Sequence, residues 1–247
     1  MSPALIRTYR RPALSALVAG LLLAANAAEA TSQGCERPCV GPRHGAIMVA
    51  GGGELDTSIY RRFVKLAGGE NAKIVLIPTA GARYGSHDGW TAIEELQRAG
   101  VEQLEVLHTR SSAVADLAAF AAPLKEATGV WFSGGRQFRH VDVYLQTETH
   151  RELRAVLERG GIIGGNSAGA SALASYLVRG SEDAALVMAP DKDIGFGFLR
   201  NVAIDQHILA RGRENNLLDV LKQYPHLLGL GLSEGSAILV TRDLAEV

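Results

Sequence analysis

A serine flanked by glycines is a candidate for chemistry in this sequence. Ser167 lies at the centre of the stretch GNSAG at residues 165–169, which directly follows the short apolar run of residues 161–163. In many hydrolases the pattern G-x-S-x-G forms a sharp turn between a strand and a helix, and this turn exposes the serine hydroxyl as a nucleophile. The glycines permit the strained backbone that such a turn needs. The alternative is that small residues let a helix pack closely on a sheet, without any chemistry.

A serine nucleophile needs a neighbouring base, because a free hydroxyl reacts poorly. Of the histidines in the chain, His207 stands out because it closes the segment 203–207, an apolar stretch that ends in three polar residues. A strand that ends in this way carries its polar side chains to the edge of a sheet, where binding sites form. A purely structural histidine at a strand end is the alternative to a general base.

A catalytic base needs an acid that orients it. Glu234 follows the apolar run of residues 228–232 and precedes a glycine. A carboxylate at the end of a buried strand costs free energy unless it is hydrogen-bonded, and an imidazole would supply that bond. We therefore predict that Ser167, His207 and Glu234 act together, although position alone also fits an ordinary turn carboxylate. The order serine, histidine, acid argues against an α/β-hydrolase esterase, in which the acid precedes the histidine.

Two backbone N–H groups are candidates for stabilising the oxyanion that forms on the substrate. The N–H of Ala168 would lie at the start of the helix that follows the serine. Gly134 or Gly135, after an expected strand, would supply the second donor. A nucleotide-binding loop at residues 51–53 is disfavoured, because Asp56 occupies the position of the third glycine in G-x-G-x-x-G.

Short apolar runs alternate with amphipathic segments along most of the chain. This alternation predicts a mostly parallel sheet covered by helices on both faces. We expect strands at residues 46–50, 73–77, 104–107, 130–132, 162–163, 202–204, 228–232 and 237–240. Ligands bind at the carboxyl ends of the strands in such a sheet. The glycine-rich turns at residues 51–53, 134–135 and 164–165 therefore mark the expected site.

Helices are expected between the strands. Asp88 is predicted to cap one of them, residues 113–123 to form an alanine-rich helix, and Thr149 and Glu152 to form a capping box. The expected apolar faces are Trp90, Ile93 and Leu96; Leu153, Val156 and Leu157; and Leu217, Leu218 and Leu221.

The N-terminal 30 residues have the pattern of a secretory signal peptide. Three arginines precede an apolar run at residues 13–25, and two A-x-A cleavage sites follow it. The run is too short to span a membrane. We therefore expect export to the periplasm or out of the cell, a linker at residues 31–45, and a single domain over residues 46–247.

The two cysteines of the chain, Cys35 and Cys39, lie in the expected linker. A disulfide that closes this small loop fits an oxidising compartment. A C-x-x-x-C pair is not by itself a metal site, and the sequence has no further cysteine to complete one. We expect no metal and no cysteine nucleophile.

The charge balance bears on the class of partner. The formal net charge is −1, so the chain has no electrostatic footprint for nucleic acid or for an anionic membrane. Apolar residues make up 47% of the sequence, which is ordinary for a globular domain with a sizeable core. A small or locally recognised partner is therefore expected.

Three segments with polar residues at strand ends form a set that is typical of one family. The segments are GNSAGA at residues 165–170, DQH at 205–207 with RGR at 211–213, and GLSE at 231–234. This set resembles the cyanophycinases, serine peptidases of family S51, from about Ala46 to the end of the chain. The resemblance implies a three-layer α/β/α sandwich, similar to the class I glutamine amidotransferases and flavodoxin-like. It also implies that Ser167 is the nucleophile, His207 the base and Glu234 its orienting acid.

The resemblance implies a substrate as well. Cyanophycinases hydrolyse cyanophycin, a polyaspartate backbone whose side chains carry arginine, to β-aspartyl-arginine dipeptides, without a metal or cofactor. Arg211 and Arg213 would bind carboxylates through paired hydrogen bonds. Gln137 matches a pocket glutamine of the family, and Asp205 and Gln206 would bind a guanidinium group or the peptide backbone. The resemblance also implies a homodimer.

Four positions depart from the family pattern. Arg136 replaces an aspartate, and Ile208 replaces an aromatic residue. Asn216 replaces an arginine, and Ser233 replaces an acidic residue. These changes open two alternatives: a related peptidase for aspartyl or isoaspartyl dipeptides, and a noncatalytic exported binding protein. The chain also ends sooner after the expected acid than the family pattern implies, so a truncated C-terminus is a further expectation.

Overall fold

The computed structural model describes residues 39–81, 87–183 and 185–247, apart from the side chains of residues 87–90. The expected signal peptide and most of the expected linker, including Cys35, lie outside these residues. Cys39, the described member of the cysteine pair, is buried and disulfide-bonded.

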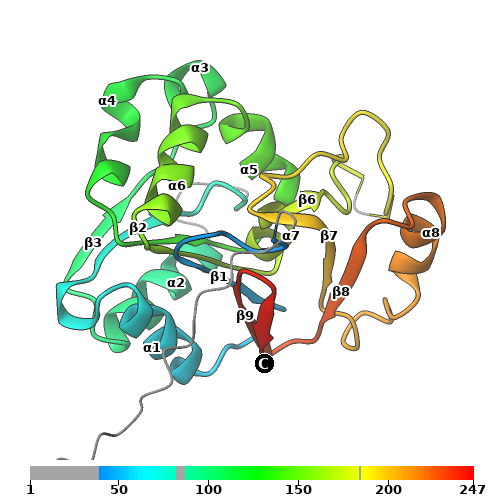
Figure 1. Cartoon of the computed structure of the whole chain (residues 1–247), viewed down its shortest axis with the longest axis horizontal. Coiled ribbons are helices and arrows are strands. Elements are labelled where there is room, and N and C mark those ends of the chain that lie inside the picture. Colours follow the sequence, from blue (N-terminus) through cyan, green and yellow to red (C-terminus); the bar gives the residue numbers. More distant parts are fainter. Residues whose placement is uncertain (1–38, 82–86, 184) are drawn as a thin grey trace, which may run out of the picture. The chain divides into compact units, whose positions relative to one another are not determined.

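Among the described residues, seven strands form a central sheet in the order β10-β9-β1-β5-β4-β2-β3 (Figure 1). Their bounds are β1 (Ala46–Ala50), β2 (Lys73–Ile77), β3 (Gln103–Val106), β4 (Gly129–Phe132), β5 (Ile162–Asn166), β9 (Ala237–Thr241) and β10 (Leu244–Glu246). Strands β1 to β5 run parallel to one another. Strand β9 pairs antiparallel with β1, and β10 with β9. The prediction of a mostly parallel sheet is confirmed.

Helices cover both faces of this sheet, as Figure 1 shows. One face packs on α1 (Thr57–Leu66) and α2 (His87–Arg98), and the other on α5 (Gln137–Tyr144), α6 (Glu148–Glu158) and α7 (Ala168–Leu173). Successive residues of a strand point to opposite faces, so each strand contributes to two cores. Trp131, for example, packs toward α1, whereas its neighbours Val130 and Phe132 pack on the other side. The predicted three-layer sandwich is therefore confirmed. No helix in the described ranges has both the length and the apolar character that a membrane span needs.

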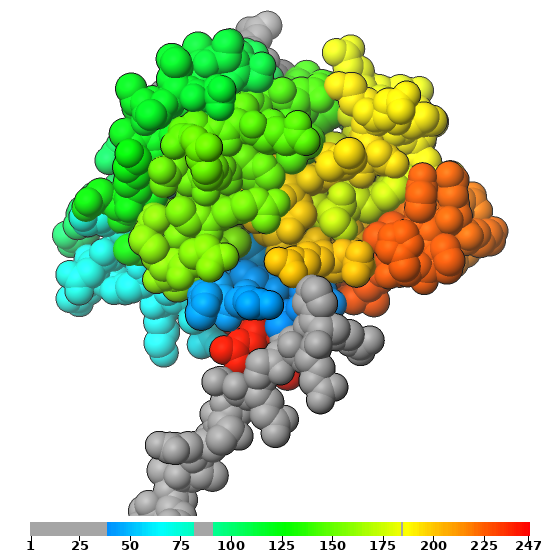
Figure 2. Space-filling view, turned by 45° about the horizontal axis from the view of Figure 1, so that its top comes forward, coloured from blue at the N-terminus to red at the C-terminus, as the bar shows by residue number. Residues whose placement is uncertain are grey.

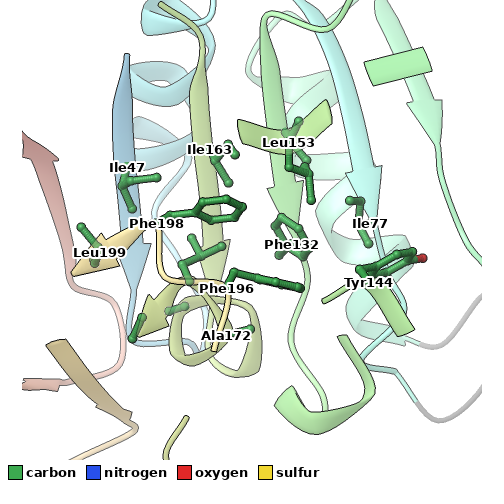
Figure 3. Close-up of a cluster of buried hydrophobic side chains, with 14 of the residues drawn as sticks. Ile47, Ile77, Phe132, Tyr144, Leu153, Ile163, Ala172, Phe196, Phe198 and Leu199 are labelled. Atoms are coloured by element: carbon green, nitrogen blue, oxygen red, sulfur yellow. The ribbon is translucent and has the colours of Figure 1, made fainter. Parts of the chain in front are cut away.

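The larger core lies under α5 to α7 (Figure 3). Phe132, the last residue of β4, contacts Phe196 at a ring-centroid distance of 5.4 Å and meets the edge of His140 at 5.1 Å. Aromatic pairs at such distances bury large apolar areas in a defined geometry. This packing fixes the end of β4, from which residues 133–135 lead to the candidate site.

A second, smaller sheet carries part of the candidate site. It consists of β6 (Ala174–Tyr176), β7 (Leu199–Gln206) and β8 (Leu228–Leu232), all parallel, with α8 (Asn216–Gln223) packed on β7 and β8. The strands at 202–204 and 228–232 were predicted, but not their separation from the main sheet. These strands lie in a separate sheet because β9 pairs with the edge of β1. In Figure 2 the yellow and orange segments around this sheet form the surface beside the green helices.

The single helix predicted at residues 113–123 is wrong. The structure has α3 (Ser112–Ala115), α4 (Ala118–Ala121) and a 3-10 helix at Ala122–Lys125. Leu117 adopts an extended backbone with ψ 129°, which ends the first helix and starts the second. Proline in the first turn of the 3-10 helix prevents continuation of the α-helical hydrogen bonds.

Three details of the other helices also differ from expectation. The cap of α6 is Thr147, whose side chain accepts from His150 N, whereas Thr149 lies inside the helix and donates to Ala115 O at 2.6 Å. Helix α2 begins at His87, so Asp88 lies within it rather than before it. In α8 the predicted face is only partly correct, because Leu218 is 51% exposed.

Candidate active site

Ser167 occupies the sharp turn between β5 and α7. Its backbone has φ 52° and ψ −115°, a combination that residues with a β-carbon rarely adopt. Its N–H donates to Ala50 O on β1 at 2.9 Å. Helix α7 packs so closely on β4 that a Cβ at Gly169 would lie 2.2 Å from the carbonyl oxygen of Phe132. The small residues therefore serve close packing, and the same packing holds the serine in its strained turn.

The three residues predicted to act together lie in one chain of hydrogen bonds. The distance between Ser167 Oγ and His207 Nε2 is 2.8 Å, and His207 Nδ1 bonds to the carboxylate of Glu234. An ionised carboxylate only accepts hydrogen bonds, so Nδ1 carries the proton and Nε2 is left to accept from the serine. Three elements that are distant in the sequence thus converge, because β5, β7 and β8 all end at this place.

The turn after β1 makes room for these side chains. A Cβ at Gly52 would lie 2.6 Å from His207 Cε1 and 2.9 Å from Ser167 Cβ. A Cβ at Gly53 would lie 2.8 Å from Glu234 Cβ. Both positions also have positive φ angles, 94° and 69°, which favour glycine. The glycine-rich segment at 51–53 therefore leaves the space that the imidazole of His207 and the carboxylate of Glu234 occupy.

Opposing influences act on the pKa of His207. Burial, the largest of them, lowers this pKa below its ordinary value, and the Arg211 and Arg213 cations act in the same direction. The hydrogen bond and the negative charge of Glu234 raise it. Because the net shift is downward, the imidazole is neutral at pH 7 and is able to accept a proton.

The loop after β4 lies directly against the serine. A Cβ at Gly134 would be 3.4 Å from Ser167 Cβ. Gly135 has φ 134°, and a Cβ there would lie 2.3 Å from Ala80 O, so only glycine fits. The next N–H, of Arg136, donates to the same Ala80 carbonyl at 2.9 Å. This loop is rigidly held beside Ser167, where the predicted oxyanion donors Gly135 and Ala168 would act.

A pocket of about 700 Å³ opens over the serine. Arginines on its wall are Arg98, Arg136, Arg179, Arg211 and Arg213, and carboxylates on its wall are Glu54, Glu94, Glu95 and Glu234. Arg98 pairs with Glu94 and Glu95, which also line the pocket. The other four arginines line the pocket together with Ser167 and His207, so positive charge is present in the same pocket as the serine.

The predicted binding residues take different places. Arg211 and Arg213 line the pocket. Gln206 also lines it, and its backbone and side-chain oxygens accept from Arg213 Nη1 at 3.1 and 3.2 Å. Gln137 lines the pocket too, but its Nε2 donates to Val178 O at 2.6 Å. The glutamine side chains therefore support the pocket wall.

Asp205 lies behind the pocket wall. Its side chain is fully buried and bonds to the guanidinium of Arg179. Asn216 Nδ2 donates to its other oxygen at 3.2 Å. The guanidinium that Asp205 binds is thus one of the protein's own.

Sequence reasoning missed Arg179. It follows the apolar pair Leu177 and Val178 in the chain but has no motif around it. The available signal was indirect: a carboxylate at the end of a buried strand, such as Asp205, needs a cation or several donors. That argument requires a partner without saying where in the sequence it lies.

Comparison with a family model shows to which protein family the chain belongs. The model of peptidase family S51 matches residues 47–247. The chain belongs to peptidase family S51. The relatives of this chain include proteins named cyanophycinase. That of Geminocystis herdmanii is 28% identical over 207 residues, which is 80% of this chain and 75% of that protein. That of Synechococcus elongatus is 31% identical over 205 residues, which is 81% of this chain and 63% of that protein.

Solved structures support the fold of this S51 chain. A peptidase from an acI-B1 Actinobacterium matches with a TM-score of 0.64 and 21% identity, covering 81% of this chain and 84% of that one. A putative peptidase E protein from Listeria monocytogenes matches with a TM-score of 0.59 and 14% identity, covering 82% and 97%. The three-layer sandwich is therefore shared with other peptidases.

Proposed function

We propose that this S51 peptidase is a serine peptidase in which Ser167 is the nucleophile, His207 the general base and Glu234 the orienting acid. The observation that carries the proposal is the hydrogen-bonded chain from Ser167 Oγ through His207 to Glu234, at the floor of a pocket. The strained backbone of Ser167 supports it, since strain of this kind clusters at functional sites. A noncatalytic binding protein would not need such an arrangement.

In the first half of the reaction, Ser167 Oγ attacks the carbonyl carbon of the substrate amide, and His207 Nε2 takes the hydroxyl proton. Glu234 stabilises the imidazolium that forms. The N–H groups of Ala168 and Gly135 bind the oxyanion of the tetrahedral intermediate. The C–N bond then breaks as His207 returns the proton to the leaving amine, which leaves an acyl group on Ser167.

In the second half, water attacks the acyl carbonyl and gives a proton to His207. The ester bond breaks, the proton returns to Ser167 Oγ, and the acid product leaves. His207 later donates each proton that it accepts. The proton transfers of the reaction therefore balance without a metal or cofactor.

We further propose that the substrate is cyanophycin and that β-aspartyl-arginine dipeptides are released. The named relatives and the DQH and RGR segments support this choice. Cyanophycin carries carboxylates and guanidinium groups, and the pocket wall offers charges of both signs. In the substrate complex, Arg211 and Arg213 would bind a carboxylate through paired hydrogen bonds.

The test is incubation of purified protein with cyanophycin, with detection of β-aspartyl-arginine by mass spectrometry. Dipeptide from the wild type and none from Ser167→Ala is the expected result. No dipeptide from folded wild type would exclude cyanophycin as the substrate.

A second candidate substrate class is aspartyl or isoaspartyl dipeptides. Arg136 favours it, because this exposed cation lies on the pocket wall near Ser167 and adds to the positive charge there. A substrate with a free side-chain carboxylate would match this charge better than one whose carboxylate is linked to arginine. Hydrolysis rates for Asp-X and β-Asp-X dipeptides, measured beside cyanophycin, separate the two classes.

We also propose that the protein is exported, on the basis of the N-terminal arginines, apolar run and A-x-A sites. Cell fractionation tests this directly: the mature protein should appear in the periplasm or the medium and begin near residue 31.

A further inference from the structure

Hydrogen bonds fix the backbone at Arg179, a residue of the pocket wall, and at the residue before it. It follows β6, and only 6% of its surface is exposed. Its N–H donates to Val187 O at 2.8 Å, and the carbonyl just before it, of Val178, accepts from Gln137 Nε2 at 2.6 Å. Its φ of 54° is unusual for a residue with a side chain. The backbone here is fixed by its neighbours.

The charges around Arg179 do not balance. Its Nη1 bonds to Asp205 Oδ1, and Arg213 Nη1 lies 3.7 Å from that same oxygen. Two guanidinium groups therefore share one buried carboxylate. The pKa of Arg213 is lowered, first by burial and then by the charge of Arg179. The two cations repel each other, and an anion placed between them would relieve this repulsion.

Arg179 also has hydrogen-bond donors to spare. A guanidinium has five N–H donors, and among the described residues Asp205 is the acceptor for this one. In the described part of the chain, two fully buried side-chain atoms have no hydrogen-bond partner, Ser133 Oγ and His140 Nδ1. Neither belongs to Arg179. The remaining donors of Arg179 are therefore not fully buried, and Arg179 lines the same pocket as Ser167.

We propose that Arg179 is a specificity-determining residue, which binds a carboxylate of the substrate together with Arg213 and so positions the residue on the acyl side of the scissile bond beside Ser167. This inference rests on the proposed function, since it concerns the same pocket. The ligand class is an amino acid residue with a free carboxylate, of the size of aspartate, which corresponds to the second candidate substrate class, aspartyl or isoaspartyl dipeptides. Asp205 holds Arg179 in place from behind.

The test is a binding measurement, because it does not depend on turnover. Calorimetric titration of the purified protein with L-aspartate and with L-asparagine compares a carboxylate with a carboxamide of the same shape. Charge-assisted hydrogen bonds predict a preference for aspartate of about 10- to 100-fold in the wild type. The variant Arg179→Gln should reduce this ratio to about 1 to 2. A wild type without the preference, or an Arg179→Gln that keeps it, would overturn the proposal.

Arg98→Gln is the matched control. It removes the same charge from the same pocket, but from an arginine that already pairs with Glu94 and Glu95. The ratio should stay near the wild-type value. An equal loss of preference in Arg98→Gln would mean that only the overall field of the pocket matters, and the role assigned to Arg179 would be wrong.

Loss of the buried pair is a risk for folding, so a second variant removes both charges. In Arg179→Gln with Asp205→Asn both members of the buried ion pair are replaced by neutral side chains, and Arg213 keeps its bonds to Gln206. If Arg179 only neutralised Asp205, this folded double variant would still prefer aspartate, against the proposal. A wild type that shows the Arg179-dependent preference but hydrolyses no peptide would contradict the proposed function alone.

Discussion

At the scale of single residues, the proposed mechanism depends on one imidazole whose pKa is subject to two opposing influences. Burial lowers the pKa of His207, while Glu234 raises it through a hydrogen bond and its charge. The result is a base that is neutral at pH 7 yet oriented toward Ser167 Oγ at 2.8 Å. The carboxylate matters for the tautomer as well as for the charge, because it accepts a hydrogen bond from the N–H at Nδ1.

The acid side of the pH profile follows from this pKa. Protonated His207 cannot accept the serine proton, so kcat/KM falls as the pH drops through the pKa of His207. Because that pKa is lowered from the ordinary histidine value of 6.5, the half-maximal point on the acid side should lie below pH 6.5. A pH profile of kcat/KM measures it, and a half-maximal point clearly above pH 6.5 would contradict this account.

Glu234→Gln should reduce kcat/KM by about 10²- to 10⁴-fold, because an amide no longer enforces the required tautomer. Glu234 also raises the pKa of His207, so the residual activity should persist to lower pH than in the wild type. Steady-state kinetics across pH measure both effects. An unchanged kcat/KM would show that Glu234 does not orient the base.

The residues of the triad could be predicted from their types and positions, whereas Arg179 could not. A G-x-S-x-G turn and polar residues at strand ends are local signals, and Ser167, His207 and Glu234 each carry one. The partner of a buried carboxylate is chosen by the tertiary fold. Asp205 was predicted in the pocket, but it lies behind the wall because β7 directs it toward Arg179.

At the scale of elements, a glycine turn on a neighbouring strand sets the geometry of the site. The loop after β1 passes so close to the imidazole that a Cβ at Gly52 would lie 2.6 Å from His207 Cε1. Atoms at this distance must move apart. The loop therefore fixes the position of His207.

Gly52→Ala should lower kcat/KM by at least about 10²-fold, because displacing a catalytic group by about 1 Å costs this much. Gly69→Ala is the control: it also has a positive φ, of 63°, but its Cβ would meet nothing within 4 Å. The control should retain nearly full activity although its backbone is strained. Equal losses in the two variants would mean that backbone strain, and not contact with His207, is responsible.

The strands were easier to predict than the helices. The bounds of β1, β2 and β8 coincide with the expected ones, because short apolar runs between turn residues mark buried strands clearly. The helix at 113–123 was wrong because alanine-rich composition does not reveal an extended residue such as Leu117. The second sheet was not predicted because strand pairing depends on contacts that are distant in the sequence.

At the scale of the whole molecule, two buried histidines link stability to pH. His140 is fully buried, and its Nε2 donates to Ser133 O at 3.0 Å. His150 donates from Nε2 to Phe196 O at 3.1 Å. Burial lowers the pKa of each to about 4. Both imidazoles are therefore neutral in the folded protein at pH values where the unfolded chain is already protonated.

The free energy of unfolding should fall as the pH decreases from about 6.5 toward 4. The sign follows from the lowered folded-state pKa: the unfolded chain binds protons first, so acid favours unfolding in this window. For His140, with a pKa of about 4, the effect is of the order of 3 kcal/mol at pH 4. Urea unfolding at several pH values measures it. A His140→Gln variant should lose less stability over this window, and an unchanged slope would contradict the assignment.

Labelling of Ser167 by a fluorophosphonate, followed by intact-mass and peptide mass spectrometry, tests whether this serine is an activated nucleophile. We expect one adduct, located on Ser167, absent in Ser167→Ala and formed at least about 100-fold more slowly in His207→Gln, because the base activates the hydroxyl. No adduct on folded wild type, or an equal rate in His207→Gln, would contradict the claim that these residues form the catalytic centre.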